Sequence, residues 1–390
     1  MTNMEQPHIL YDSQIFDLQK FGGISRYFCE IISKLGMAYD ISVRFTENHY
    51  LAQAKLARHR IHAPHFFFKH YKKRLLLENQ KLTNRLLQTS SPYLFHPTYY
   101  NPSFLEHIGD HPYVITVHDM IHELFPEYFH DAKEVMAQKK EVITKASRII
   151  AISENTKKDI VNILNIDPQK IDVIYHGTSI KSHHGKDELS LPNRYILFVG
   201  DRTLYKNFQR LLEALAIIHK TDQDLYLLCT GHPFNWEEKK LIDKLNITDK
   251  IIQISINDRN LNELYGRALL FVFPSLYEGF GIPVLEAYAC KCPVVLSNTS
   301  CFPEIAGNAG AYFDPYSIES MVQTLTEIIG DSEKRASLVA AGIERLQLYS
   351  WEKATRETEK VYQKVLNETL NPKTLSLIHI SEPTRPLYIS

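Results

Sequence analysis

Short apolar runs separated by helix-like segments recur along the whole chain, and this alternation constrains the fold more than any other feature. The runs are rich in Val, Ile, Leu, Tyr and Phe, and most end in polar or glycine turns such as Gly200-Asp201. Strands that are buried on both faces of a sheet have this near-continuous apolar character. Helices between such strands serve as crossovers and make the strands parallel. The sequence therefore predicts α/β domains built on parallel sheets.

The apolar runs form two sets, which predicts two domains. The chain has 390 residues, more than one ordinary domain holds. We expect strands at His8–Leu10, Ile41–Phe45, Leu94–His96, Tyr113–Val117, Ile149–Ile152 and Val173–Tyr175, and then at Tyr195–Val199, Leu225–Cys229, Ile251–Ile254, Leu270–Phe273 and Val294–Leu296. The polar stretch 182–193 is the expected linker. We place the first domain at 1–187 and the second at 188–345.

Charge and cysteine content exclude some classes of protein. Lys plus Arg number 44 and Asp plus Glu 45, a balance that argues against a bulk nucleic-acid binder. Five scattered cysteines without a CxxC pair suggest reduced thiols. No signal peptide or membrane-spanning apolar run is recognisable. We therefore expect a cytoplasmic location, including the inner face of the cell membrane.

The segment Ser275–Ala287, SLYEGFGIPVLEA, carries the strongest chemical signal. Its two glycines let backbone N–H groups approach a ligand closely, and Pro283 suits the first turn of a helix. Helix N-termini attract phosphate. Glu278 on the loop and Glu286, expected about two turns into the helix, can both accept hydrogen bonds from hydroxyls. The alternative is a glycine-rich turn with two solvent-exposed glutamates.

This segment and four others resemble one family. Glu278–Glu286 resembles the E-x7-E motif of the retaining GT-B glycosyltransferases of family 4. The other similar segments are the G-x-x-x-x-x-K-N stretch 200–207, the G-G loop 21–26, His118-Asp119, and Ser350-Trp351-Glu352 at the start of a closing helix. The resemblance covers about residues 8–368.

The resemblance implies a fold and an activity. The fold would be GT-B, an α/β architecture of two Rossmann-like domains facing a central cleft, with a helix at 346–370 returning to the first domain. The first domain would bind the acceptor and the second the nucleotide-sugar donor. The enzyme would move a sugar from a nucleotide-sugar donor onto a glycan or lipid-linked acceptor, with retention of configuration. The form HDMIHELFPEYF is close to that of mannosyltransferase-like members, so we expect GDP-mannose as donor and surface polysaccharide or lipopolysaccharide O-antigen as product.

The resemblance also assigns roles to individual residues. Arg202 and Lys206 would neutralise the diphosphate, Glu278 would contact the transferred sugar, and Glu286 would bind the ribose. His118 would contact the donor sugar and assist the oxocarbenium-like transition state, and Asp119 either orients it or binds acceptor. Further donor contacts are expected from Gly22, Gly23, Ile254, Gly279, Phe280, Gly281, Ile282 and Leu285. The alternatives are ordinary surface cations at 202 and 206 and a structural loop histidine at 118.

Two patterns could suggest a metal, and we predict none. Asp222-Gln223-Asp224 lies in a polar turn, where solvated acids are common. His118 and His122 are four apart, which makes a zinc pair only on a helix, and a strand has just ended there. No cofactor is expected either, since the nucleotide-sugar is a substrate.

The segment 51–87 is strongly basic. It holds nine Lys or Arg against one acid, with Phe66, Phe67, Phe68 and Tyr71 in its middle. Basic charge beside exposed aromatics suits an anionic membrane surface. A solvated helix pair with an aromatic core is the alternative, and no nucleic-acid module is recognisable.

Rival readings remain open. A dehydrogenase would need G-x-G-x-x-G after its first strand, which neither half shows. A GT-B epimerase or phosphorylase, or a non-catalytic sugar-nucleotide-binding protein, would share the layout. The segment 374–390 resembles vector-derived read-through and is excluded from the fold prediction; a genuine tail is the alternative.

Overall fold

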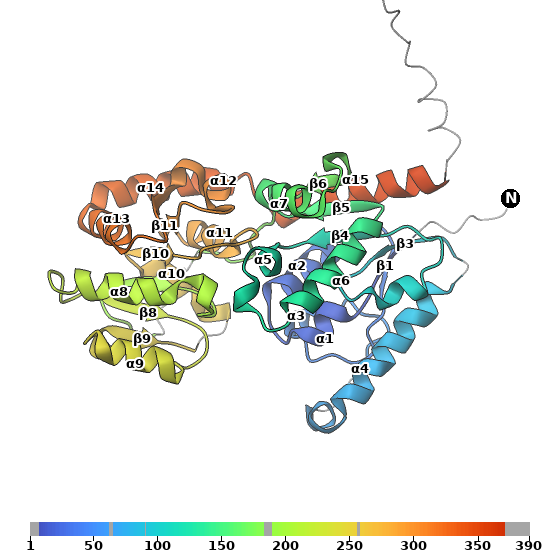
Figure 1. The fold of residues 1–390 in the computed structure, drawn as a ribbon, viewed down its shortest axis with the longest axis horizontal. Coiled ribbons are helices and arrows are strands. Elements are labelled where there is room, and N and C mark those ends of the chain that lie inside the picture. Colours follow the sequence, from blue (N-terminus) through green and yellow to red (C-terminus); the bar gives the residue numbers. More distant parts are fainter. Residues whose placement is uncertain (1–7, 62–64, 90, 183–188, 256–257, 371–390) are drawn as a thin grey trace, which may run out of the picture.

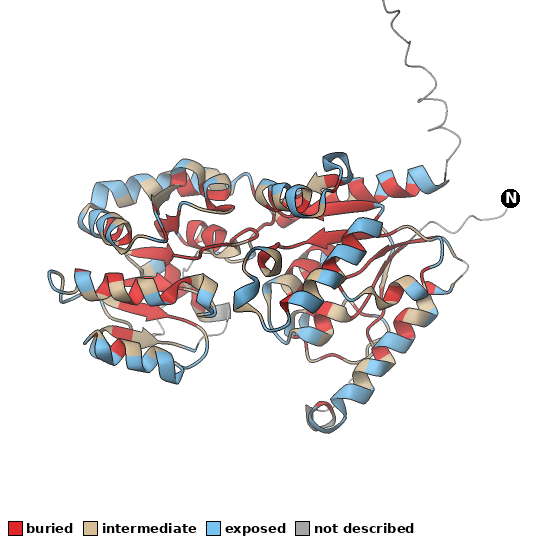
Figure 2. Cartoon of the chain, in the orientation of Figure 1, coloured by how far each residue is buried: buried red, intermediate tan, exposed pale blue. Residues whose placement is uncertain are grey.

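The computed structural model describes residues 8–61, 65–89, 91–182, 189–255 and 258–370, which form two α/β halves lying side by side (Figure 1). The expected tail 374–390 and half of the expected linker, residues 183–188, fall outside the described residues. Buried residues concentrate along the strands and on the inward faces of the helices (Figure 2). Within the described ranges, no helix combines the length and apolarity needed to cross a bilayer.

The first half is built on parallel strands, as the apolar runs predict. They are β1 (His8–Tyr11), β2 (Tyr39–Ile41), β3 (Tyr93–His96), β4 (Val114–Val117), β5 (Arg148–Ala151) and β6 (Ile171–Val173). They pair as β2-β1-β3 and β4-β5-β6. A single parallel bridge between Phe95 and Tyr113 joins the two sets. The strand order therefore reverses at β1 and β3, which are neighbours in the sheet.

Helices flank this sheet on both sides. They are α1 (Gln14–Leu18), α2 (Gly23–Ser33), α3 (His49–Ala54), α4 (His65–Leu87), α5 (Ile121–Leu124), α6 (Ala132–Lys145) and α7 (Glu154–Leu164). The apolar face of α2, including Tyr27, Phe28, Ile31 and Ile32, is buried. Helix α4 projects from the body of the half (Figure 1).

The second half is one six-stranded parallel sheet. Its strands are β7 (Tyr195–Phe198), β8 (Tyr226–Cys229), β9 (Ile251–Gln253), β10 (Leu270–Phe273), β11 (Val294–Ser297) and β12 (Gly310–Phe313), in the order β12-β11-β10-β7-β8-β9. Its helices are α8 (Phe208–Ile218), α9 (Trp236–Lys244), α10 (Asp258–Arg267), α11 (Ile282–Ala289), α12 (Phe302–Ala306), α13 (Ile318–Gly330) and α14 (Ser332–Leu346). This is the Rossmann order, which reverses at β7 and β10.

The last helix, α15 (Trp351–Leu370), returns to the first half. It contacts α2, β3 and β5, and its apolar face is part of the first half's core. The hydroxyl of Tyr362 lies 2.9 Å from that of Tyr11 and 2.6 Å from Nδ1 of His96. The expected closing helix is therefore confirmed.

Some local expectations were wrong. Strands β2 and β6 each begin two residues earlier than expected. Strand β12 was not expected at all.

Candidate active site

The loop 274–281 leaves the carboxyl end of β10 and leads into α11, beside the loop that leaves β7. Parallel sheets bind ligands outside their carboxyl edge where the strand order reverses, because neighbouring loops diverge there and leave a crevice. The acidic loop with Glu278 and the basic loop with Lys206 therefore meet at the expected place.

Lys206 and Glu278 form an ion pair at this edge. The Nζ of Lys206 lies 2.6 Å from Oε1 of Glu278. The two side chains are mostly buried, with 16% of Lys206 and 14% of Glu278 exposed. Burial alone would lower the pKa of Lys206, but Glu278 and the Tyr205 hydroxyl outweigh it, so the pKa lies above its ordinary value. Lys206 therefore stays charged near pH 7.

Glu286 is buried one turn into α11, not two turns as expected, and it joins the two halves of the chain. Its residue is 4% exposed, so the alternative of a solvent-exposed glutamate is wrong here. Oε1 lies 3.2 Å from Nη1 of Arg26 on α2, and Oε2 accepts a hydrogen bond from the Tyr265 hydroxyl at 3.3 Å. Arg26 had no expected role, although it ends the glycine loop 21–26.

Arg202 does not join the Lys206–Glu278 pair. Its Nε donates to Glu238 at 2.7 Å, and its Nη1 donates to the carbonyl of Thr230 at 2.8 Å. Its guanidinium also lies 4.8 Å from the centre of the Phe234 ring. The guanidinium is thus held by the second half itself.

His118 is buried at the end of β4. Its backbone N–H donates to the Tyr100 hydroxyl at 3.1 Å, and its ring meets Tyr27 edge-on with 5.1 Å between centroids. Burial lowers the pKa of His118 to about 4, so the imidazole is neutral near pH 7. Its Nε2 is buried and has no hydrogen-bond partner among the described residues. An unused buried nitrogen is costly unless a ligand satisfies it.

A buried cation holds the loop that carries His118. Nζ of Lys139, on α6, donates to the carbonyl of Asp119 at 2.8 Å and lies 2.9 Å from Oε2 of Glu123. Both Lys139 and Glu123 side chains are at most 3% exposed. Burial would raise the pKa of Asp119, but Lys139 and nearby donors lower it below its usual value. Sequence patterns did not reveal Lys139.

The acidic loop touches the His118 loop directly across the seam between the halves. A Cβ added to Gly279 would lie 1.7 Å from the His118 carbonyl oxygen, so only glycine fits. The Ser153 hydroxyl donates to the Gly279 carbonyl at 2.7 Å, and the Met120 N–H donates to the Tyr277 hydroxyl at 3.3 Å. The structure therefore brings both expected catalytic loops into contact.

The other expected donor-site residues lie partly in this loop and in α11 and partly at the ends of other elements. Gly281 has φ +87° and stands just before α11, where its conformation excludes most side chains. Phe280 packs on His176 with 4.8 Å between ring centroids. Ile282 packs against the cores of both halves, whereas the Leu285 side chain lies inside the second core. The remaining residues are Gly22 and Gly23 at the start of α2 and half-buried Ile254 after β9.

Two family models match successive parts of the chain. "Glycosyltransferase Family 4" matches residues 21–181, and "Glycosyl transferases group 1" matches residues 179–345. Together the two models span residues 21–345. The chain belongs to the glycosyltransferases that they describe. It is therefore an enzyme of the hexosyltransferase type.

Relatives and solved structures agree with this family. The glycosyltransferase is 28% identical over 294 residues to the O-antigen chain mannosyltransferase B of Escherichia coli. The alignment covers 71% of this chain and 76% of that protein. A sucrose-phosphate synthase of Thermosynechococcus elongatus superposes with TM-score 0.71 at 18% identity, covering 93% and 99% of the two chains. Anabaena HepE, solved with UDP and glucose, also gives 0.71, at 17% identity and 92% and 100% coverage. The fold of this glycosyltransferase is GT-B.

The acidic triplet at 222–224 makes surface contacts. Asp222 pairs with Arg194 at 2.9 Å. In the part of this glycosyltransferase that the structure describes, no group of three or more His, Cys, Asp or Glu side chains is arranged to hold a metal.

Proposed function

We propose that this glycosyltransferase transfers mannose from GDP-mannose, with retention of configuration, onto a glycan of a surface polysaccharide such as O-antigen. The observation that carries the proposal is that the segment 278–286 forms two ion pairs, Glu278 with Lys206 and Glu286 with Arg26. The proposed phosphate-binding cation thus pairs with one of the two proposed hydroxyl-binding carboxylates, and the other carboxylate reaches the first half. The relative named as an O-antigen mannosyltransferase supports the choice of sugar and product.

Each group has a physical task in this proposal. Lys206 neutralises the charge that gathers on the leaving diphosphate, the kind of stabilisation that contributes most to many enzymatic rates. The N-terminus of α11 adds backbone N–H groups and a favourable dipole. Glu278 and Glu286 accept hydrogen bonds from sugar and ribose hydroxyls. His118, neutral and with a free Nε2, contacts the donor sugar near the breaking bond.

Arg202 takes a more distant role in this proposal, because Glu238 already neutralises it. It fastens the loop that carries Lys206 to the carbonyl of Thr230 and to Glu238. No metal is proposed, so activity should persist when EDTA removes divalent cations. Retention is checked by the coupling constant of the anomeric proton in the product.

The donor is tested by thermal unfolding with a panel of nucleotide-sugars. A ligand that binds only the folded state raises the melting temperature by mass action. GDP-mannose should raise it more than GDP-glucose, UDP-glucose or UDP-N-acetylglucosamine. The shift should shrink strongly in Glu286→Gln and remain in Asp224→Asn, a matched acid in a surface turn. Equal shifts for wild type and Glu286→Gln would contradict the proposed ribose contact.

Turnover separates the rival activities. A transferase releases GDP faster when a glycan acceptor is added, whereas an epimerase turns over donor without one. A phosphorylase needs inorganic phosphate, and a non-catalytic binder shows protection without turnover. Release of GDP that does not depend on acceptor would overturn the transferase proposal.

We also propose that α4 approaches an anionic membrane, where a lipid-linked acceptor would lie. Lys69, Lys72, Lys73 and Arg74 are exposed along this helix, and Tyr71 is 51% exposed. Phe68 is buried, so it contributes to the core instead of the surface. Binding to phosphatidylglycerol vesicles should exceed binding to phosphatidylcholine vesicles and should weaken with salt. A Lys69→Glu, Lys72→Glu variant that still binds would contradict this.

A further inference from the structure

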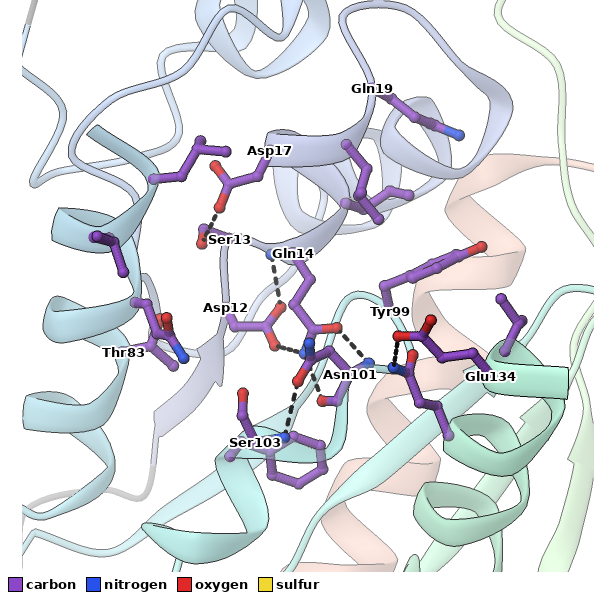
Figure 3. A pocket seen from close by; sticks show the side chains of 18 of the residues that line it. Asp12, Ser13, Gln14, Asp17, Gln19, Thr83, Tyr99, Asn101, Ser103 and Glu134 are labelled. Atoms are coloured by element: carbon purple, nitrogen blue, oxygen red, sulfur yellow. Dashed lines mark hydrogen bonds between the residues drawn. The ribbon is translucent and has the colours of Figure 1, made fainter. Parts of the chain in front are cut away.

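The carboxylate of Glu278 is held differently from the polar side chains at the carboxyl edge of the first half. There, the Gln14 side chain donates to Asp12 Oδ2 at 2.7 Å and accepts from the Asn101 N–H at 2.8 Å, so these groups fix one another (Figure 3). The Glu278 carboxylate, in contrast, pairs with Lys206, the cation that the proposed donor diphosphate would engage. Once the diphosphate engages Lys206, the direction of this carboxylate depends on its backbone.

Ser300 holds the backbone of Glu278 on both sides. It lies in the loop 298–301, between β11 and α12. Its hydroxyl accepts a hydrogen bond from the Glu278 N–H at 3.1 Å and donates one to the Glu278 carbonyl at 2.6 Å. One hydroxyl thus fixes the two planar peptide groups that flank the Cα of Glu278. Those planes set the direction in which the Glu278 side chain leaves the loop.

Ser300 adopts a strained backbone conformation where it makes these contacts. Its φ is 56°, in the left-handed region that residues with a Cβ rarely occupy. Glycine would adopt this angle without strain. Strained residues persist where surrounding contacts outweigh the strain, and they cluster at functional sites. The strain therefore points to a use for the hydroxyl, which glycine lacks.

The acidic loop is also held at its start by the second half. The Thr299 hydroxyl donates to the Leu276 carbonyl at 3.1 Å, and the Leu276 N–H donates to the Tyr205 carbonyl at 2.8 Å. Strand β10 lies between β11 and β7 in the sheet, so these contacts reach the acidic loop from both of its neighbours. They fix the start of the loop, and Ser300 fixes the residue that carries the carboxylate.

The next residue of the loop is held by the other half of the chain. The Gly279 carbonyl accepts a hydrogen bond from the Ser153 hydroxyl, which belongs to the first half. That contact requires the two halves to touch, whereas Ser300 and Glu278 belong to the same half. A carboxylate held within one half is oriented before the donor arrives, and a group that is already oriented costs little entropy on binding.

We propose that Ser300 is a positioning residue that orients Glu278 toward the transferred sugar of the donor, within the second half alone. The proposal rests on the proposed glycosyl transfer and on the sugar contact of Glu278. It adds the residue on which recognition of the sugar, as distinct from the nucleotide, depends. Removing the hydroxyl therefore weakens binding of the nucleotide-sugar and leaves binding of the nucleoside diphosphate unchanged.

The test compares Ser300→Ala with Ser300→Gly in the full chain. Both variants lack the hydroxyl, but only glycine also relieves the left-handed strain. Calorimetric titration gives the Kd for GDP-mannose and for GDP. We expect the Kd for GDP-mannose to rise about tenfold or more in both variants, as for a lost hydrogen bond to a charged group, and the Kd for GDP to stay within about twofold of the wild type. The melting temperature of Ser300→Gly should exceed that of Ser300→Ala by about 2 °C or more.

Lys291 provides the matched control. It is exposed, lies between α11 and β11, and has φ 58°. Lys291→Gly should melt above Lys291→Ala by a similar margin, because it relieves the same strain. Both Lys291 variants should bind GDP-mannose as the wild type does.

Three outcomes would overturn the role of Ser300. They are wild-type affinity for GDP-mannose in both Ser300 variants, wild-type affinity in Ser300→Gly alone, and an equal loss of affinity for GDP and GDP-mannose. The second would show that strain, and not the hydroxyl, governs the site. A wild type that binds GDP but not GDP-mannose defeats the proposed donor instead, and the same comparison is then made with the nucleotide-sugar of the panel that does bind.

Discussion

Replacing Gly279 by Ala tests whether the two halves must touch for transfer to occur. The added Cβ would lie 1.7 Å from the His118 carbonyl oxygen, while real Cβ contacts are essentially never closer than 3.0 Å. The acidic loop and the His118 loop must therefore separate by at least about 1.3 Å. The φ angle of Gly279 is not in the left-handed region, so steric contact alone causes the effect.

A displacement of this size is large for catalysis. Misplacing reacting groups by about 1 Å can reduce the rate roughly 10²-fold. We expect kcat for acceptor-dependent GDP release to fall by that order, with a smaller change in donor KM because Glu286 and Lys206 remain in the second half. Each half should keep its core, so the circular-dichroism spectrum should be unchanged.

Gly330→Ala is the matched control. A Cβ at Gly330 meets nothing within 4 Å, and the residue ends α13 on the exposed surface. Its activity should equal that of the wild type. If Gly279→Ala kept activity within about threefold of the wild type, contact across the seam would not be needed for transfer and this reasoning would be wrong.

Two further predictions concern buried ionisable groups. Lys139→Met leaves the Glu123 carboxylate buried and unpaired, which should lower the free energy of unfolding by about 3–5 kcal/mol in urea titrations; adding Glu123→Gln should restore much of it, and no restoration would contradict the ion-pair argument. Because the pKa of His118 is lowered to about 4 in the folded state, the unfolded chain takes up this proton first as the pH falls. The free energy of unfolding of the wild type minus that of His118→Gln should thus be constant above about pH 6.5. It should fall by up to about 1.4 kcal/mol per pH unit toward pH 4, and a difference that does not change with pH would contradict burial of the neutral ring.

The strands were predictable because their signal is local. Strand β10, for example, is LFVF, four buried apolar residues in a row. Strand β12, GAYF, was missed because it lies at the edge of the sheet, begins with glycine and has only one buried residue. Edge strands are shielded on fewer sides, so their sequences carry a weaker apolar signal.

The site was predictable only where its parts are close in sequence. Glu278 and Glu286 stand in one motif, but the partner of Glu286 is Arg26, 260 residues away. Glu238, which binds Arg202, is likewise distant, at a separation of 36 residues. Local patterns report helices, turns and strand ends, whereas these pairings arise from tertiary packing. Lys139 was missed for the same reason, because in the sequence it looks like the other lysines of its helix.

The return of α15 to the first half has a consequence for biosynthesis. The buried hydroxyl of Tyr362 contacts that of Tyr11, 351 residues earlier in the chain. A ribosome adds residues in order, so the first sheet emerges long before the helix that completes its core. Until α15 has been translated, the apolar surface that Val361 and Val365 later cover stays open to solvent or to chaperones. The second half can therefore finish folding before the first one does.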